Sequence, residues 1–136
     1  MKGFTPSALF IHGDYLAVFG TSWGTFSYAY KTQYTYIKIY DCSNRAQPFL
    51  LKEFQVGGSY FNGRKLDDGF MYLITNHDFS LIRRPWFNIG AGRFDLPFNS
   101  IFWYPGTYSR ATSVNIISFN LGNPIASTKK IISICA

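Results

Sequence analysis

The sequence has few of the residues that bind metals or carry acid–base catalysis. Its 136 residues include two cysteines, Cys42 and Cys135, two histidines and seven acidic residues. No CxxC pair and no Cys/His cluster occurs, so the sequence predicts neither a metal site nor a cofactor. The two cysteines could be bonded to each other, be free, or be bonded within a larger assembly.

Long hydrophobic runs are also missing. A membrane-spanning helix needs about 20 consecutive apolar residues, and no stretch approaches this length, so we expect no transmembrane segment. The first residues, MKGFTPS, lack the apolar core and cleavage site of a signal peptide. No Asn-x-Ser/Thr glycosylation acceptor occurs. We expect either a cytoplasmic protein or a chain that is a piece or a mature form of a longer one.

Acidic residues are outnumbered by 13 basic residues, which gives a net charge of +6. A basic chain could bind nucleic acid, but such proteins gather Lys and Arg on one face or along one stripe. Here the basic residues are scattered and form no more than adjacent pairs, such as Arg83-Arg84 and Lys129-Lys130. The charge is therefore interpreted as a solvated surface, and no nucleic-acid partner is expected.

Aromatic residues, in contrast, are abundant. Ten Tyr, fourteen Phe and three Trp make up 20% of the chain, and 47% of all residues are hydrophobic, which is enough for a core. Aromatic and β-branched residues fit the pleated, half-buried surface of a sheet. The composition therefore predicts an all-β fold.

Residues 35–76 show the strand pattern most clearly. Four strands separated by Gly, Pro, Asp and Asn are predicted at residues 36–40, 50–56, 59–66 and 70–75. Asp67-Asp68-Gly69 predicts a tight hairpin turn between the last two strands. Four short antiparallel strands of this kind are typical of one blade of a β-propeller.

A similar alternation of strands and turns occurs on both sides of this stretch. Further strands are predicted at residues 7–11, 15–20, 112–120 and 125–134. His12-Gly13-Asp14 forms a turn between the first two strands, and residues 21–33 read as a connection rich in Gly, Ser, Thr and aromatic residues. This recurrence indicates an internal repeat of about forty residues, the length of a four-stranded blade.

The repeat divides the chain into two blade-like halves, at about residues 7–56 and 58–134, with an insertion at about 77–111. We predict one domain over residues 1–136, an incomplete β-propeller of about two antiparallel four-stranded blades with a long aromatic insertion. A propeller closes with about four to eight blades, and a repeat unit cannot bury its apolar faces alone. The chain would then be a fragment, a ring-forming oligomer, or a pair of blades covered by a partner.

The order of the motifs resembles a family of secreted-type β-propeller domains, found mainly in archaea and bacteria and distantly related to tryptophan-aspartate repeats. The resemblance covers about residues 9–124 and rests on Tyr40-Asp41, Pro48, Gly58-Ser59-Tyr60, Arg64, Tyr72-Leu73-Ile74-Thr75, Pro97 and Ile101-Phe102-Trp103-Tyr104. It implies a propeller fold and an extracellular location, but no particular activity. The chain departs from the family in size, because family members have several hundred residues.

The insertion is the best functional candidate, since loops longer than about 15 residues are usually functional or disordered. It combines arginines with aromatic residues, which are enriched at the centres of interfaces. The residues predicted to bind are Arg83, Arg84, Trp86, Phe87, Trp103 and Tyr104, together with Arg64. The alternatives are that the aromatic residues pack as a small core and that the planar Arg64 group pairs within or between blades.

Two functions are compatible with these observations. The favoured one is a non-catalytic interaction or scaffold module, part of a larger propeller or assembly, that binds a protein partner or further copies of itself. The alternative is a carbohydrate-active or hydrolase-like propeller with its site at the blade loops. That alternative needs carboxylates about 5–10 Å apart, and the insertion offers only Asp78 and Asp95.

The remaining polar residues are interpreted as structural. His12 lies in a predicted turn, and His77 next to Asp78 is a weak signal because catalysis needs a nucleophile or second carboxylate nearby. Aspartates in turns bond their own backbone, which is the interpretation for Asp41, Asp67 and Asp68. No catalytic residue is predicted, and of the two functions the non-catalytic one is favoured over an enzymatic one.

Overall fold

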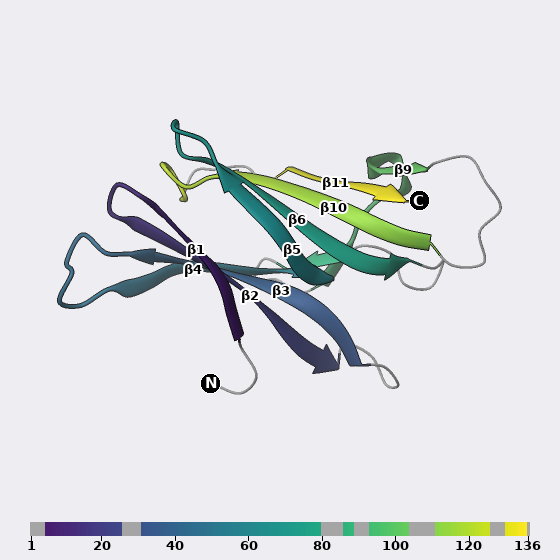
Figure 1. The fold of residues 1–136 in the computed structure, drawn as a ribbon, viewed down its shortest axis with the longest axis horizontal. Coiled ribbons are helices and arrows are strands. Elements are labelled where there is room, and N and C mark those ends of the chain that lie inside the picture. Colours follow the sequence, from purple (N-terminus) through teal and green to yellow (C-terminus); the bar gives the residue numbers. More distant parts are fainter. Residues whose placement is uncertain are drawn as a thin grey trace.

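Two β-sheets make up the described part of the chain (Figure 1). The computed structural model describes residues 5–25, 31–79, 86–88, 93–103, 111–125 and 130–135. These residues contain eleven strands and one turn of 3₁₀ helix, but no α-helix. None of the described segments forms a helix with the length and apolar character needed to cross a membrane. The predicted all-β fold is confirmed.

The first sheet has six strands. In order across the sheet they are β1 (Thr5–His12), β2 (Tyr15–Thr25), β3 (Lys31–Asp41), β4 (Phe49–Gly57), β7 (Trp86–Asn88) and β8 (Arg93–Asp95). Every neighbouring pair is antiparallel. The first four strands follow one another directly in sequence, which is the arrangement of a four-stranded blade.

The second sheet has five strands. In order across the sheet they are β5 (Ser59–Lys65), β6 (Phe70–Phe79), β10 (Ala111–Asn120), β11 (Lys130–Cys135) and β9 (Ile101–Trp103). The first four form an antiparallel meander, whereas the short β9 runs parallel to β11. Strands β6 and β10 pair along their whole lengths although the insertion separates them in the sequence.

The hairpin turns form where the sequence places Asp and Gly. The backbone N–H of Ser43 donates to Asp41 Oδ1 at 2.8 Å, and that of Phe70 donates to Asp68 Oδ1 at 3.1 Å. Gly69 follows Asp68 with φ +86°, a left-handed conformation that favours glycine. The turn predicted at residues 67–69 and the turn-forming roles of both aspartates are confirmed.

A single residue, Gly58, connects the two sheets. Its φ of +95° suits glycine, and a Cβ there would collide with the backbone carbonyl of Asn76. At the preceding Gly57, a Cβ would lie 2.7 Å from the indole nitrogen of Trp86. The chain therefore turns from β4 into β5 at a corner where no side chain fits.

The two sheets pack face to face around one apolar core. Because side chains alternate along a strand, one face of each sheet contributes to it. The buried residues are Ala17, Phe19, Ile37, Ile39, Phe54 and Val56 of the first sheet and Met71, Leu73, Ile117, Phe119 and Leu121 from the second. The ring of Phe119 lies 5.4 Å from that of Phe54 and 6.3 Å from that of Phe19 between centroids, so aromatic contacts join the sheets.

The structure differs from the connection predicted at residues 21–33. Strand β2 continues to Thr25 and β3 begins at Lys31, and the two segments pair in register. Glycines at positions 20 and 24 suggested a loop, but the β-branched and aromatic residues beside them favour strand. The strand predicted from residue 125 begins, within the described residues, only at Lys130.

Two further differences concern the predicted insertion. Strand β6 extends into it, because His77 pairs with Ser113 and Asp78 with Thr112 on β10. The described part of the insertion is also not a plain loop. It contains β7, β8, a 3₁₀ turn (Phe98–Ser100) and β9, and it adds strands to the outer edges of both sheets.

Candidate interaction surfaces

The structure describes only some of the residues predicted to bind a partner. Three lie outside the described residues, namely Arg83, Arg84 and Tyr104. Trp103 ends strand β9, but its side chain is likewise outside the described part. The side chains that can be placed are those of Trp86, Phe87 and Arg64.

Trp86 is part of the interior. Its side chain is 1% exposed, lies against Gly57, and has its ring centre 6.2 Å from that of Tyr34 on β3. Its neighbour Phe87 is half-buried and packs against Leu96 and Ile101. For these two aromatic residues, the structure therefore shows the packing that the sequence left open as the alternative to a binding surface.

The insertion forms a second, smaller core that joins the outer edges of the sheets. Leu96 and Ile101 are buried there, packed between Phe87 of the first sheet and Ile131 of the second. We call Phe87, Leu96, Ile101 and Ile131 the edge clasp. By linking β7 to β11, the edge clasp closes the side of the two-sheet core, and the described insertion is at least partly structural.

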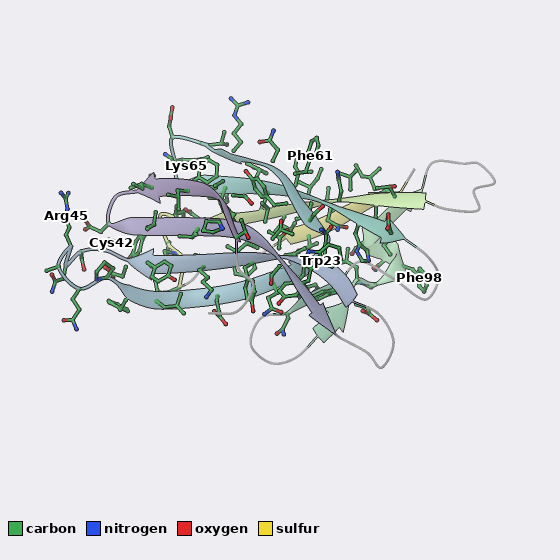
Figure 2. All side chains as sticks on the ribbon, turned by 60° about the horizontal axis from the view of Figure 1, so that its bottom comes forward. Trp23, Cys42, Arg45, Phe61, Lys65 and Phe98 are labelled. Carbon is green, nitrogen blue, oxygen red and sulfur yellow. The ribbon has the colours of Figure 1, made fainter. Side chains whose placement is uncertain are left out.

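Two phenylalanines of the insertion remain exposed, Phe98 in the 3₁₀ turn and Phe102 on β9. Figure 2 shows Phe98 at one end of the molecule, with Cys42 and Arg45 of the β3–β4 turn at the other. Cys42 is a free, partly buried cysteine. The exposed aromatic residues of the insertion are therefore far from the β3–β4 turn.

Arg64 lies on the side of the second sheet that faces away from the core. It is exposed on β5, directly opposite Tyr72 of β6. Among the described residues, Lys38 Nζ forms an ion pair with Glu53 Oε2 at 3.7 Å, whereas Arg64 forms no ion pair. An Arg without an acidic neighbour on a sheet face is available to an incoming carboxylate.

An apolar row crosses the outward side of the first sheet. Ile11 of β1 pairs with Leu16 of β2, which pairs with Tyr40 of β3, which pairs with Leu50 of β4. Leu9 and Val18 form a further pair beside this row. We call these six residues the first outer face. Ile11 is 65% exposed, and Leu9 and Leu50 are exposed as well.

The second sheet carries an equivalent row. Ile116 of β10 pairs with Ile74 of β6 on one side and Ile132 of β11 on the other. Beside it, Val114 pairs with Ile134, and Ile134 pairs with Phe102 of β9. We call these six residues the second outer face. Ile132 is 41% exposed, and Ile134 and Phe102 are also exposed.

Each outer face is comparable in area to the apolar patches that serve as interaction sites in other proteins. Four strands about 4.8 Å apart and six residues long, at about 3.3 Å each, cover roughly 400 Å² of sheet. On the first sheet this area also holds the ion pair of Lys38 and Glu53, which lies beside Val18. The largest apolar patch on a monomeric protein is about 300–600 Å² and is often functional. Both outer faces are therefore candidate docking surfaces, on opposite sides of the packed pair.

One sequence pattern could have predicted these surfaces, although no prediction was based on it. Residues 70–74 read Phe-Met-Tyr-Leu-Ile, with apolar or aromatic residues at both alternating positions. Such runs are typical of strands that are covered on both faces. Among the described residues of β6, Met71 and Leu73 are buried in the core, whereas Phe70 and Tyr72 on the other face are exposed.

Buried polar side chains between the sheets donate hydrogen bonds to the backbone carbonyls at the corner formed by Gly57 and Gly58. Asn115 Nδ2 donates to the carbonyl of Gly57 at 3.3 Å and to Thr75 Oγ1 at 3.2 Å, and Thr75 Oγ1 donates to the same carbonyl at 3.0 Å. Thr35 Oγ1 donates to the carbonyl of Gly58 at 2.9 Å. These bonds satisfy backbone groups that the turn between the sheets leaves unpaired, so this cluster is structural.

The acidic and histidine candidates do not assemble into a recognisable site. Asp78 is exposed on β6 of the second sheet, and Asp95 is exposed on β8 of the first. The described residues contain no group of three or more His, Cys, Asp or Glu side chains that could hold a metal ion. The imidazole of His12 lies close against Gly69 and Gly122, two turns of the second sheet, as a packing residue.

A comparison with protein families identifies the fold. The profile described as β-propeller domain matches residues 1–133. No curated protein matches the chain, and no solved structure does. The match leaves the secreted-type subgroup and the extracellular location as predictions. The described residues form two β-sheets, which are too few to close a ring of about four to eight blades. The family match and the all-β structure together show that the chain belongs to the β-propeller domain family.

Proposed function

We propose that the protein is a non-catalytic interaction module of the β-propeller type, a scaffold whose two outer faces dock further β-sheets of a larger assembly. One observation carries this proposal: each sheet is packed on one face and presents a row of exposed aliphatic residues on the other. In a propeller, a blade packs on neighbours at both of its faces. The outer faces have the composition of such contacts without the neighbour.

The energetics favour covering these faces. Removing apolar surface from water stabilises by about 25 cal/mol per Å², so covering a face of roughly 400 Å² contributes at most about 10 kcal/mol before other terms. The contribution is smaller on the first sheet, where Lys38 and Glu53 occupy part of the area. Association opposes this with a loss of translational and rotational freedom of about 4–15 kcal/mol. A single docked face would therefore bind weakly, and stable assembly requires both faces to be used.

The insertion supplies a further proposed surface for a protein partner. Phe98 and Phe102 are exposed there, and aromatic residues beside arginines are enriched at interface centres. In this proposal Arg83, Arg84, Trp103 and Tyr104 contact the partner. Phe87 supports this surface through the edge clasp, and Trp86 holds the same strand against Gly57 of β4.

The docking role of the outer faces can be tested with paired substitutions that retain strand propensity. Leu9→Thr with Ile11→Thr alters the first outer face, and Ile132→Thr with Ile134→Thr alters the second. Ile125→Thr is the matched control, because Ile125 is 72% exposed but lies in a turn outside both faces.

Light scattering and the fluorescence of a hydrophobic dye measure the result. We expect the wild-type chain to associate or to bind the dye, each double variant to do so less, and the control to behave as the wild type. Circular dichroism confirms that every variant is folded. A monomeric wild-type chain that ignores the dye, with variants indistinguishable from the control, would contradict the proposed function.

A further inference from the structure

We propose that each outer face is covered by the opposite outer face of a second copy of this chain, so that identical chains associate head to tail. This inference rests on the proposed function, in which the outer faces are docking surfaces, and it adds the identity of the partner. The first outer face of one copy would contact the second outer face of the next.

The chain carries both halves of one sheet-on-sheet contact. The first outer face is a flat row of aliphatic and aromatic side chains across four antiparallel strands, from Ile11 to Leu50. The second is a row of isoleucines, from Ile74 to Ile132, across strands of the same arrangement. Since the inner faces of these two sheets already pack on each other, the outer faces point in opposite directions. A second copy placed in series repeats the layering of sheets that the chain contains.

Charge complements the apolar match. On the outward side of the first sheet, Glu53 is 47% exposed in its side chain despite its ion pair with Lys38. On the second sheet, Arg64 is exposed and has no ion pair among the described residues. Asp78 lies on the same strand face toward the other end of β6. A head-to-tail contact brings the side that carries Glu53 and Lys38 against the side that carries Arg64, whereas a contact between two second outer faces brings two copies of Arg64 to one interface.

The size of the contact predicts how the assembly behaves. Two faces of roughly 400 Å² bury about 800 Å², less than the roughly 1,200 Å² at which specific interfaces become stable. A head-to-tail contact uses both faces of every chain, and it closes into a ring when the rotation permits. Once a ring forms, each chain is held by two contacts, which raises the overall affinity. About four to eight blades correspond to roughly two to four copies.

The net charge of +6 also has a measurable effect. Like-charged copies repel one another, and salt screens this repulsion over about 10 Å at 0.1 M. Association through apolar faces should therefore strengthen as salt is added. An assembly held mainly by ion pairs would weaken instead.

Charged substitutions on each face test the inference. Ile11→Glu disables the first outer face and Ile132→Glu disables the second, while Ile125→Glu in the turn is the control. The mass of each purified chain is measured by light scattering over a concentration series. We expect the wild type and the control to form a discrete multiple of 15.5 kDa, and each face variant alone to remain at 15.5 kDa.

Mixing the two face variants is the decisive step. Each variant retains the face that the other has lost, so an equimolar mixture should form a one-to-one dimer. Because a single contact holds this dimer, we expect it only toward the high-concentration end of the series, where either variant alone is still a monomer. Association through like faces would abolish assembly in only one variant, and the mixture would gain no mixed dimer. That result overturns the head-to-tail contact but leaves the proposed function intact.

Two other outcomes separate the inference from the proposed function. If the wild-type chain stays monomeric but binds a hydrophobic dye, self-association is wrong. The outer faces would then be docking surfaces for a different chain. A monomer without dye binding overturns both proposals. If a glutamate variant is unfolded by circular dichroism, Ile11→Thr and Ile132→Thr with the same mixing step replace it.

Discussion

Replacing Trp86 by Ala should destabilise the protein strongly, because the structure buries this indole against Gly57 and Tyr34. The side chain is 1% exposed and fills the space above Gly57. Truncating a fully buried Trp to Ala typically costs about 3–5 kcal/mol through lost burial and the cavity that remains. Natural domains are stable by only about 5–15 kcal/mol. Much of the free energy of unfolding therefore depends on this residue.

Urea denaturation followed by far-ultraviolet circular dichroism measures the change. Trp23→Ala is the matched control, since Trp23 has the same side chain but is 62% exposed near the end of β2. Substitutions at exposed positions usually change stability by less than about 0.5 kcal/mol. We expect a large drop in the denaturation midpoint for Trp86→Ala and nearly none for Trp23→Ala.

A double-mutant cycle with Gly57 tests the packing directly. A Cβ at Gly57 would lie 2.7 Å from the indole nitrogen of Trp86, so Gly57→Ala should be costly in the wild type. In the Trp86→Ala background that obstacle is gone, and the same change should cost less, by a coupling of about 0.5–3 kcal/mol. Equal stability losses for Trp86→Ala and Trp23→Ala, or additive effects in the cycle, would refute the reasoning.

Two further predictions concern the corner between the sheets and an aromatic pair on β3. Gly58→Ala should lower the free energy of unfolding by more than the roughly 1–2 kcal/mol that a left-handed alanine costs, because the new Cβ meets the carbonyl of Asn76. Gly13→Ala is the control: Gly13 has φ +58° but open space around it, so denaturant titration should show a loss of only that amount. Burial, followed by a hydrogen bond with Tyr34, raises the pKa of Tyr36 from 10.0 to about 12. The neutral phenol is favoured in the fold, so this contribution to stability is complete below pH 10 and is lost between pH 10 and 12. Tyr36→Phe should flatten the fall of the denaturation midpoint across that range, and an unchanged pH dependence would argue against a buried phenol.

The local parts of the fold could be predicted because they depend on neighbouring residues. The turn at Asp68 and Gly69 forms from a side chain that bonds its own backbone and a glycine that accepts positive φ. The strands around Ile37 and Leu73 follow from β-branched and aromatic residues. Strand ends were predicted less well, because β6 extends to Phe79 only through pairing with β10, which is distant in the sequence.

The candidate site also combines features that follow from neighbouring residues with features that depend on residues distant in the sequence. The exposure of Arg64 on β5 agrees with a residue that can meet a partner. Trp86 looked like a surface anchor because its neighbours in the sequence are polar or aromatic. Its burial depends on Gly57, on a different strand, which leaves room for the indole.

The sequence by itself determined the fold class, the long strands and the tight turn at residues 67–69, since these depend on backbone propensities and on short hydrogen bonds. Only the tertiary structure decided which face of each strand is covered. Met71 and Leu73 lie in the core, whereas Phe70 and Tyr72 face outward, although all four residues are hydrophobic. A strand with apolar residues at both alternating positions does not specify which side meets the other sheet. The corner at Gly58 sets that choice, because it brings the second sheet over one face of the first and leaves two apolar faces outside.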